Sequence, residues 1–103
     1  MSPVVVKDPL MSKETAESLM ERGQDSLKSG DIVTARMLFG RLADAGVADA
    51  AFAAGQTYDP AYLAAHHVLG VAGDEAKAHE FYQRAAQLGS TDAAAHLAAA
   101  TAK

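Results

Sequence analysis

Four histidines are the residues best suited to chemistry in this sequence, because an imidazole can bind a metal or transfer a proton near neutral pH. His66 and His67 are neighbours, so on a helix their side chains point about 100° apart and cannot chelate one ion from the same face. His79 and His96 lie in different predicted helices, and no His-x-x-x-His pair exists. We therefore expect no metal site.

Sequence patterns for nucleophilic or phosphate chemistry are missing as well. No Gly-x-Ser-x-Gly elbow is present, and Ser90 is better explained as a helix cap. The stretch 70–74 has two glycines but lacks the Lys-Ser/Thr pair of a phosphate-binding loop and follows no predicted strand. No cysteine is available as a nucleophile or zinc ligand. The sequence predicts a protein that is not an enzyme and uses no cofactor.

Composition and charge limit the classes of partner. The 103 residues suit one domain, with a formal net charge of −4. The nine Lys and Arg residues are scattered singly, so no basic stripe for nucleic acid forms. No apolar run approaches the roughly 20 residues of a membrane-spanning helix, and we expect no membrane insertion. Alanine occurs 24 times and only 27 apolar side chains are larger, so the helices must pack closely.

Turn and capping residues divide the chain into an N-terminal arm and a series of helices. Residues 1–11 contain two prolines and three consecutive valines, which favours an extended or disordered arm. The alternative is a strand that pairs with the sheet edge of a partner. From Ser12 onward the apolar residues recur with helical spacing. The caps and breaks predict helices over residues 12–29, 31–46, 49–58, 60–67, 74–88 and 90–101.

Two stretches of the sequence are similar at a shift of 43 residues. Between residues 30–54 and 73–97, nine of 25 positions are identical. The shared residues supply a helix stop and cap, a small side chain for close helix contact, and a glycine for a left-handed turn. They are the pairs Gly30/Gly73, Asp31/Asp74, Ala35/Ala78, Arg41/Arg84, Ala43/Ala86, Gly46/Gly89, Asp49/Asp92, Ala50/Ala93 and Ala51/Ala94. A fixed period in helix pairs is typical of an α-solenoid.

These residues resemble the tetratricopeptide superfamily, and in particular its Sel-one-like branch. Gly23, Ala35 and Phe39 follow the plain tetratricopeptide spacing. The Sel-one-like pattern is matched by Ala54-Gly55-x-x-Tyr58 and by Gly73-Asp74-x-x-Lys77-Ala78-x-x-Phe81-Tyr82-x-Arg84-Ala85-Ala86-x-x-Gly89. The resemblance covers about residues 12–101. It implies an all-α fold, a short α-solenoid of antiparallel helix pairs with five or six helices.

The resemblance also implies boundaries within a helical domain of residues 12–103. Repeat one would cover about 12–46, repeat two about 47–89, and a capping helix about 90–102. Residues 59–69 depart from the family pattern, because they lengthen the usual turn. We expect them to form an extra helix that fills the gap between repeats. The alternatives are that they block or build part of a groove, or form a dimer surface through Tyr62 and His66.

Members of this family bind peptides or proteins on a concave face, which the first helix of each pair lines. Carried over from Gly23 and Gly55, the implied contact residues are Glu17, Met20, Gln24, Leu27 and Lys28 in repeat one, and Asp49, Phe52, Gln56 and Asp59 in repeat two. Glutamine and lysine can bind a backbone or a carboxylate. For Met20, Leu27 and Phe52 the alternative is burial in the core, where apolar residues of a helix stripe usually lie.

The function implied is that of a non-catalytic protein–protein interaction module of bacterial character, an adaptor or scaffold that binds a peptide or partner protein. One alternative is a structural domain that self-associates, as a homodimer or as the end of a longer protein. Another is a small chaperone for one client protein. We expect a cytoplasmic protein if the chain is complete, and the cell envelope is the alternative if the chain is a fragment.

Overall fold

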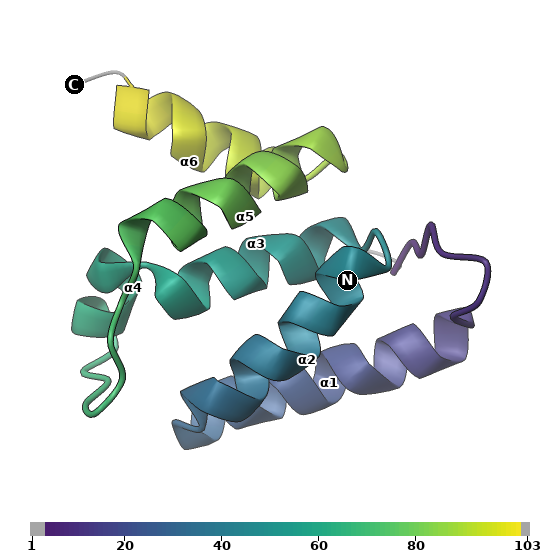
Figure 1. The fold of residues 1–103 in the computed structure, drawn as a ribbon, viewed down its shortest axis with the longest axis horizontal. Coiled ribbons are helices and arrows are strands. Elements are labelled where there is room, and N and C mark those ends of the chain that lie inside the picture. Colours follow the sequence, from purple (N-terminus) through teal and green to yellow (C-terminus); the bar gives the residue numbers. More distant parts are fainter. Residues whose placement is uncertain (1–3, 102–103) are drawn as a thin grey trace.

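The computed structural model describes residues 4–101, which form six helices and no strand (Figure 1). The helices are α1 (Lys13–Ser29), α2 (Ile32–Asp44), α3 (Ala48–Tyr58), α4 (Pro60–Ala65), α5 (Glu75–Gln87) and α6 (Thr91–Thr101). The all-helical class predicted from the sequence is therefore confirmed. Within the same residues, no helix has both the length and the apolar character needed to cross a membrane. The first three residues of the predicted arm and the last of the predicted capping helix lie outside the described part.

Local capping chemistry explains where four of the helices begin. In each, the side-chain oxygen of the capping residue accepts a hydrogen bond of 3.1 Å from the backbone N–H three residues later. Such a bond satisfies one of the N–H groups that the first helical turn leaves without a partner. The four capping residues are Ser12, Asp31, Asp74 and Ser90.

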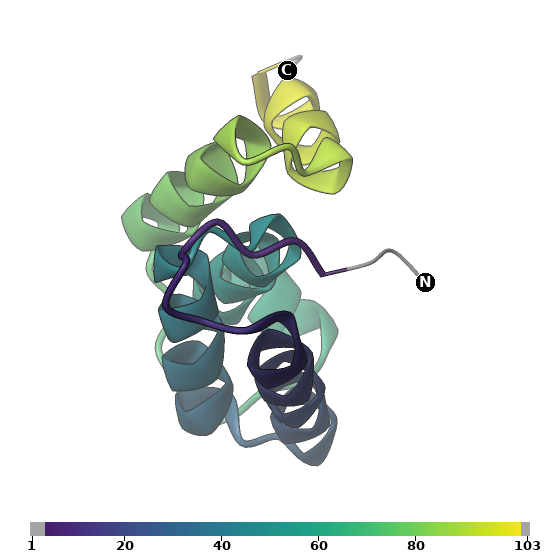
Figure 2. The same ribbon diagram turned by 90° about the vertical axis from the view of Figure 1, so that its right-hand side faces the viewer.

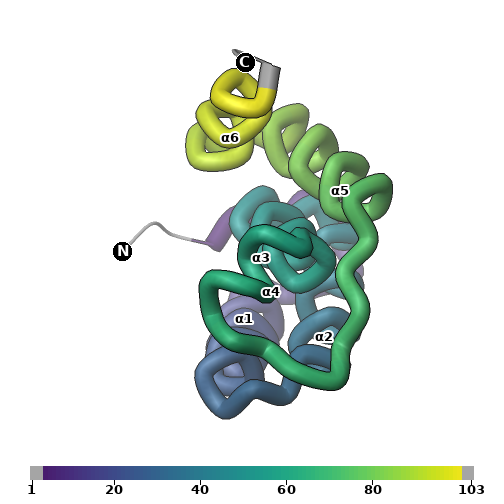
Figure 3. Tube along the Cα trace, turned by 90° about the vertical axis from the view of Figure 1, so that its left-hand side faces the viewer, coloured from purple at the N-terminus to yellow at the C-terminus, as the bar shows by residue number. Residues whose placement is uncertain are grey.

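The helices pack in sequence, except for α4. Helix α1 packs on α2, α2 on α3, α3 on α5, and α5 on α6. Helix α4 is only six residues long and contacts the end of α3. Figure 3 shows how α4 and the chain after it make a detour at this end of α3 before α5 begins.

The core consists of two clusters of buried side chains. The first lies between α1, α2 and α3 around Phe39, which is fully buried. The second is made of alanines from α2, α3, α5 and α6, namely Ala43, Ala51, Ala85 and Ala93. Because alanine has only a methyl group, the successive pairs α2–α3, α3–α5 and α5–α6 can pack closely at these positions.

Two aromatic rings lie directly on helical glycines. The Phe39 ring of α2 covers Gly23 of α1, and the Tyr82 ring of α5 covers Gly55 of α3; a Cβ atom on either glycine would lie 2.6 Å from the ring. The two rings are 43 residues apart, whereas the two glycines are 32 apart. The difference is the 11-residue length of the 59–69 segment, which we call the insertion.

The turn between α2 and α3 has the same backbone hydrogen bonds as the turn between α5 and α6. Val47 N–H donates to the Leu42 carbonyl at 3.0 Å, and Ser90 N–H donates to the Ala85 carbonyl at 2.9 Å, 43 residues later. In each turn the preceding glycine has a positive φ, 85° at Gly46 and 108° at Gly89. The sequence similarity at this shift therefore corresponds to equivalent local structure.

The described part of the arm, residues 4–11, lies against the helices without being helical (Figure 2). The backbone N–H groups of Lys7 and Asp8 both donate to the Ala45 carbonyl at 3.0 Å, at the end of α2. Val4 and Val6 pack against the first core cluster, while Val5 between them is exposed. The alternation shows that one side of this extended segment is bound to the fold.

Candidate functional site

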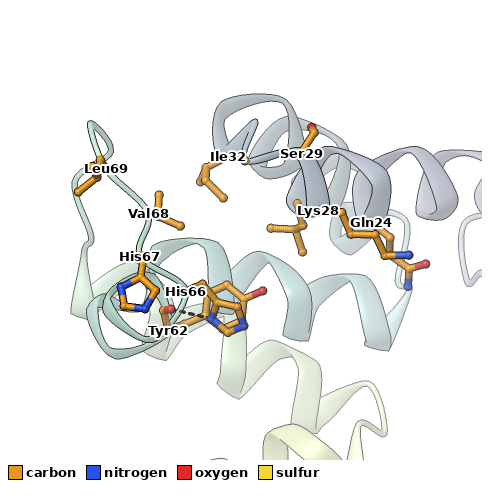
Figure 4. Close-up of a pocket in the computed structure, with 11 residues that line it drawn as sticks. Gln24, Lys28, Ser29, Ile32, Tyr62, His66, His67, Val68 and Leu69 are labelled. Carbon is orange, nitrogen blue, oxygen red and sulfur yellow. Dashed lines mark hydrogen bonds between the residues drawn. The ribbon is translucent and has the colours of Figure 1, made fainter.

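A pocket of about 640 Å³ opens where the end of α1 and the start of α2 face the insertion (Figure 4). We call it the insertion pocket. Helix α1 contributes Gln24, Leu27, Lys28 and Ser29 to its lining. The chain then turns through Gly30 into Ile32 of α2, and the insertion supplies the opposite side with Tyr62, His66, His67, Val68 and Leu69.

The lining of the insertion pocket is apolar at its base, and its opening is mostly polar with one exposed leucine. Ile32 is 2% exposed, whereas Leu69 is 90% exposed. Leu27, Tyr62 and Val68 are half-buried between them. The remaining side chains that line the opening are hydrogen-bonding or basic, and all of them are exposed: Gln24, Lys28, Ser29, His66 and His67. A pocket with an apolar base and polar groups around it is suited to binding a ligand in one orientation.

Helix α4 places the insertion beside α1. Asp59 caps this helix by accepting a hydrogen bond of 2.9 Å from the Ala61 N–H, and Pro60 occupies the first helical position. Leu63 is buried, with 5% of its surface exposed, and anchors α4 to the fold. The next turn of the chain is thereby directed toward the end of α1.

Arg36 of α2 fastens the two ends of the insertion together. Its guanidinium donates to the Thr57 carbonyl at 3.2 and 2.8 Å, before the insertion, and to the Ala72 carbonyl at 2.7 Å, after it. The same guanidinium lies 4.1 Å from the centre of the Tyr58 ring, where a cation–π contact adds to the attraction. Arg36 therefore holds the chain before the insertion close to the chain after it.

The two histidines of the insertion are fixed by different means. His66 Nδ1 is 2.9 Å from the Tyr62 carbonyl, which can only accept, so this nitrogen carries a proton and donates it. The imidazole also stacks on the Tyr62 ring at 4.0 Å between centres. His67 has a φ of 54° and is the one non-glycine residue with positive φ among residues 4–101. This left-handed position closes α4, where glycine is usually favoured.

The structure brings three of the nine contact residues implied by the sequence into the insertion pocket: Gln24, Leu27 and Lys28. Met20, on the same helix, is buried in the first core cluster with 9% exposure. Glu17 is exposed near the start of α1 and lies 3.9 Å from Lys13 as a surface ion pair.

The four implied residues around α3 do not converge on this pocket. Phe52 is half-buried, and its ring lies 5.5 Å from the Tyr82 ring. Asp49 is exposed on the first turn of α3, and Gln56 is half-buried near its end. Asp59 instead lines a second pocket, also of about 640 Å³, between α5 and α6.

The insertion residues that form half of the pocket were not among the contact residues implied by the family resemblance. Tyr62, His66, His67, Val68 and Leu69 all line it. Their only signal in the sequence is that residues 59–69 exceed the usual turn length while carrying apolar and aromatic side chains. The segment does contain the extra helix expected for it, α4, and the residues after that helix line the pocket.

The second pocket, which we call the α5–α6 pocket, contains a hydrogen-bonded group of polar side chains. Tyr82 donates its hydroxyl to Asp59 Oδ2 at 2.8 Å, and His96 Nε2 lies 3.7 Å from the same oxygen. Burial, followed by the hydrogen bond to Asp59, raises the pKa of Tyr82 well above its ordinary value. At neutral pH the phenol of Tyr82 therefore stays protonated, so it acts as a hydrogen-bond donor and not as a base. Through these contacts the three side chains connect the start of α4 with α5 and α6.

Neither pocket offers a ready site for metal chemistry. Within residues 4–101, no three His, Asp or Glu side chains lie in positions to hold one ion. No protein-family model, curated protein or solved structure matches the chain.

Proposed function

We propose that this chain is a non-catalytic protein–protein interaction module that binds a peptide segment of a partner in the insertion pocket. The observation that carries the proposal is the pocket itself. Four side chains of α1 and five of the insertion surround an apolar base and leave hydrogen-bonding groups around the opening. Such a surface can bury an apolar side chain of a peptide while Gln24 and Lys28 bind its backbone or polar groups.

We further propose that the fold is a short helical repeat related to the tetratricopeptide and Sel-one-like families. The pairs α1–α2 and α3–α5 would be its repeats and α6 its capping helix. Three observations support this: the sequential packing of the helices, the two ring-over-glycine contacts, and the equivalent turns at a shift of 43 residues. An adaptor or scaffold role follows from this fold, because repeat proteins of this kind present extended binding surfaces.

A structural role through self-association is the second candidate, and one feature of α2 favours it. Val33 and Met37 lie one helical turn apart and are 67% and 66% exposed. Together they form a small apolar strip that a second copy of the chain could cover. No comparable feature supports a chaperone for a single client.

Selection from a library of random peptides displayed on phage tests the proposed function. We expect the immobilised protein to enrich peptides whose affinity, measured by fluorescence anisotropy, falls about tenfold in the double variant Gln24→Ala and Lys28→Ala, a loss of about 1.4 kcal/mol. Gln56→Ala is the matched control, because Gln56 lines neither pocket. The proposal fails if no peptide is enriched, or if the control variant lowers the affinity as much as the double variant.

A further inference from the structure

We infer that the insertion pocket selects an acidic peptide segment, one in which an apolar side chain stands next to an Asp or Glu. This inference rests on the proposed function and adds the chemical class of the ligand. Three features of the molecule support it: the charges around the pocket, the arrangement of side chains along α1, and the backbone conformation of His67.

The charge of the pocket is opposite in sign to that of the whole chain. The chain has a formal net charge of −4, yet no Asp or Glu is among the residues that line the pocket. Lys28 lines it and has no ion-pair partner among residues 4–101. Asp25 and Asp31 lie three residues to either side of Lys28, but neither lines the pocket or forms an ion pair with it. A ligand carboxylate in the pocket would therefore meet an ammonium group, whereas a basic side chain would find no carboxylate in the lining.

The α5–α6 pocket provides an internal comparison. It has the same volume of about 640 Å³, but three carboxylates line it and no Lys or Arg does: Asp59, Glu75 and Glu80. An acidic peptide would be repelled there. Charge therefore distinguishes two pockets of equal size, and only the insertion pocket suits an acidic ligand.

The spacing along α1 fits a short extended segment with two kinds of side chain. Gln24 and Lys28 are four residues apart, so they lie on the same face of the helix, with Leu27 beside them. Across the opening lie Val68 and Leu69 of the insertion (Figure 4). An apolar ligand side chain can enter between Leu27 and Val68, which places an adjacent carboxylate within reach of Lys28.

The conformation of His67 supports a role for its side chain. A residue with a Cβ atom is disfavoured in the left-handed region, and glycine would close α4 at a lower energy. Imidazole at this position adds a group that can donate a hydrogen bond to a carboxylate. The backbone conformation at this position favours glycine, yet the residue present is a histidine whose side chain lines the pocket.

Three fluorescein-labelled peptides of equal length test the inference. Leucine alternates with glutamate in the first, with glutamine in the second and with lysine in the third. In fluorescence anisotropy at about 0.15 M salt, we expect the Leu-Glu peptide to bind about tenfold more tightly than the Leu-Gln peptide, and the Leu-Lys peptide to bind most weakly. Lys28→Gln should remove this preference. Lys13→Gln is the matched control, because Lys13 is exposed at the opposite end of α1.

His67→Gly separates binding from folding. Because glycine suits the positive φ, we expect this variant to melt at the same or a higher temperature while its affinity for the Leu-Glu peptide falls about threefold or more. A Leu69→Ser variant reports use of the pocket without disturbing the core, since Leu69 is 90% exposed.

Two outcomes distinguish failure of the inference from failure of the proposed function. If the Leu-Gln and Leu-Glu peptides bind equally and Leu69→Ser weakens both, the pocket binds peptides but the preference for acidic segments is overturned. If no peptide binds, or if binding is unaffected by Lys28→Gln, His67→Gly and Leu69→Ser alike, both the inference and the proposed function are wrong.

Discussion

At the scale of single residues, the absence of a side chain at Gly23 lets α1 and α2 pack closely, and its absence at Gly55 does the same for α3 and α5. A methyl group at either position would lie 2.6 Å from an aromatic ring, Phe39 in one case and Tyr82 in the other. We expect Gly23→Ala and Gly55→Ala each to lower the free energy of unfolding by about 1–3 kcal/mol, because the ring must move. Gly40→Ala is the control: nothing lies within 4 Å of its new methyl group.

Denaturation in guanidinium chloride measures all three glycine variants. Alanine is the better helix former, so Gly40→Ala should raise the free energy of unfolding by up to about 1 kcal/mol. Equal stability of Gly23→Ala and Gly40→Ala would contradict the ring-over-glycine contact that the repeat interpretation depends on.

Tyr82 makes the stability depend on pH in the alkaline range. Its pKa is raised in the folded state by burial and by the hydrogen bond to Asp59, whereas in the unfolded chain it is near the ordinary value of about 10. The folded state therefore retains a proton that the unfolded state releases. This contribution to stability is complete below about pH 10 and is lost as the pH rises above that value.

Tyr82→Phe tests the sign of this dependence. At neutral pH we expect the variant to be less stable by about 1 kcal/mol or more, because Asp59 loses its donor. Above about pH 10 the difference from the original protein should shrink, since phenylalanine does not ionise. Urea denaturation of both proteins across this range measures the difference, and a constant gap would show that Tyr82 does not titrate as described.

At the scale of elements, the N-terminal arm belongs to the fold along one side only. Val6 packs against the first core cluster, whereas its neighbour Val5 is 63% exposed. We expect Val6→Ser to lower the melting temperature, with a loss of about 1 kcal/mol for the half-buried side chain. Val5→Ser should change the stability by less than about 0.5 kcal/mol. Thermal unfolding compares the pair, and equal melting temperatures would mean that the arm is not bound in solution.

The boundaries of the helices could be predicted because they depend on local chemistry. Ser12, Asp31 and Asp74 cap the backbone three residues away, and Gly30 adopts the left-handed φ of 84° that ends α1. These interactions involve neighbours in the sequence, so periodicity and residue type are enough to locate them. Neither depends on how the helices later pack.

The composition of the pocket could be predicted only in part, because it depends on contacts between distant segments. The implied face of α1 included both Met20 and Gln24, but the packing around Gly23 buries Met20 and leaves Gln24 exposed. The side chains across from Gln24 come from the insertion, about 40 residues later. The two ends of this segment are held by Arg36, whose carbonyl partners cannot be identified from residue type.

At the scale of the whole molecule, the described residues form a core that needs no second copy of the chain to cover it. No buried side-chain nitrogen or oxygen within residues 4–101 lacks a hydrogen-bond partner. The large apolar side chains left exposed are spread over three segments, the arm, α2 and the insertion: Val5, Leu10, Val33, Met37 and Leu69. Only Val33 and Met37 share a helix face. The surface of these two side chains is far smaller than the roughly 800 Å² that each partner buries in a standard interface.

We therefore expect a monomer of 10.7 kDa when light scattering is coupled to size exclusion over a hundredfold range of concentration. The melting temperature should not change with concentration, because folding of a monomer involves no association. The double variant Val33→Ser and Met37→Ser should give the same mass and nearly the same melting temperature. If the original protein is instead a dimer that this variant converts to a monomer, the strip on α2 is an interface and self-association replaces peptide binding as the better supported function.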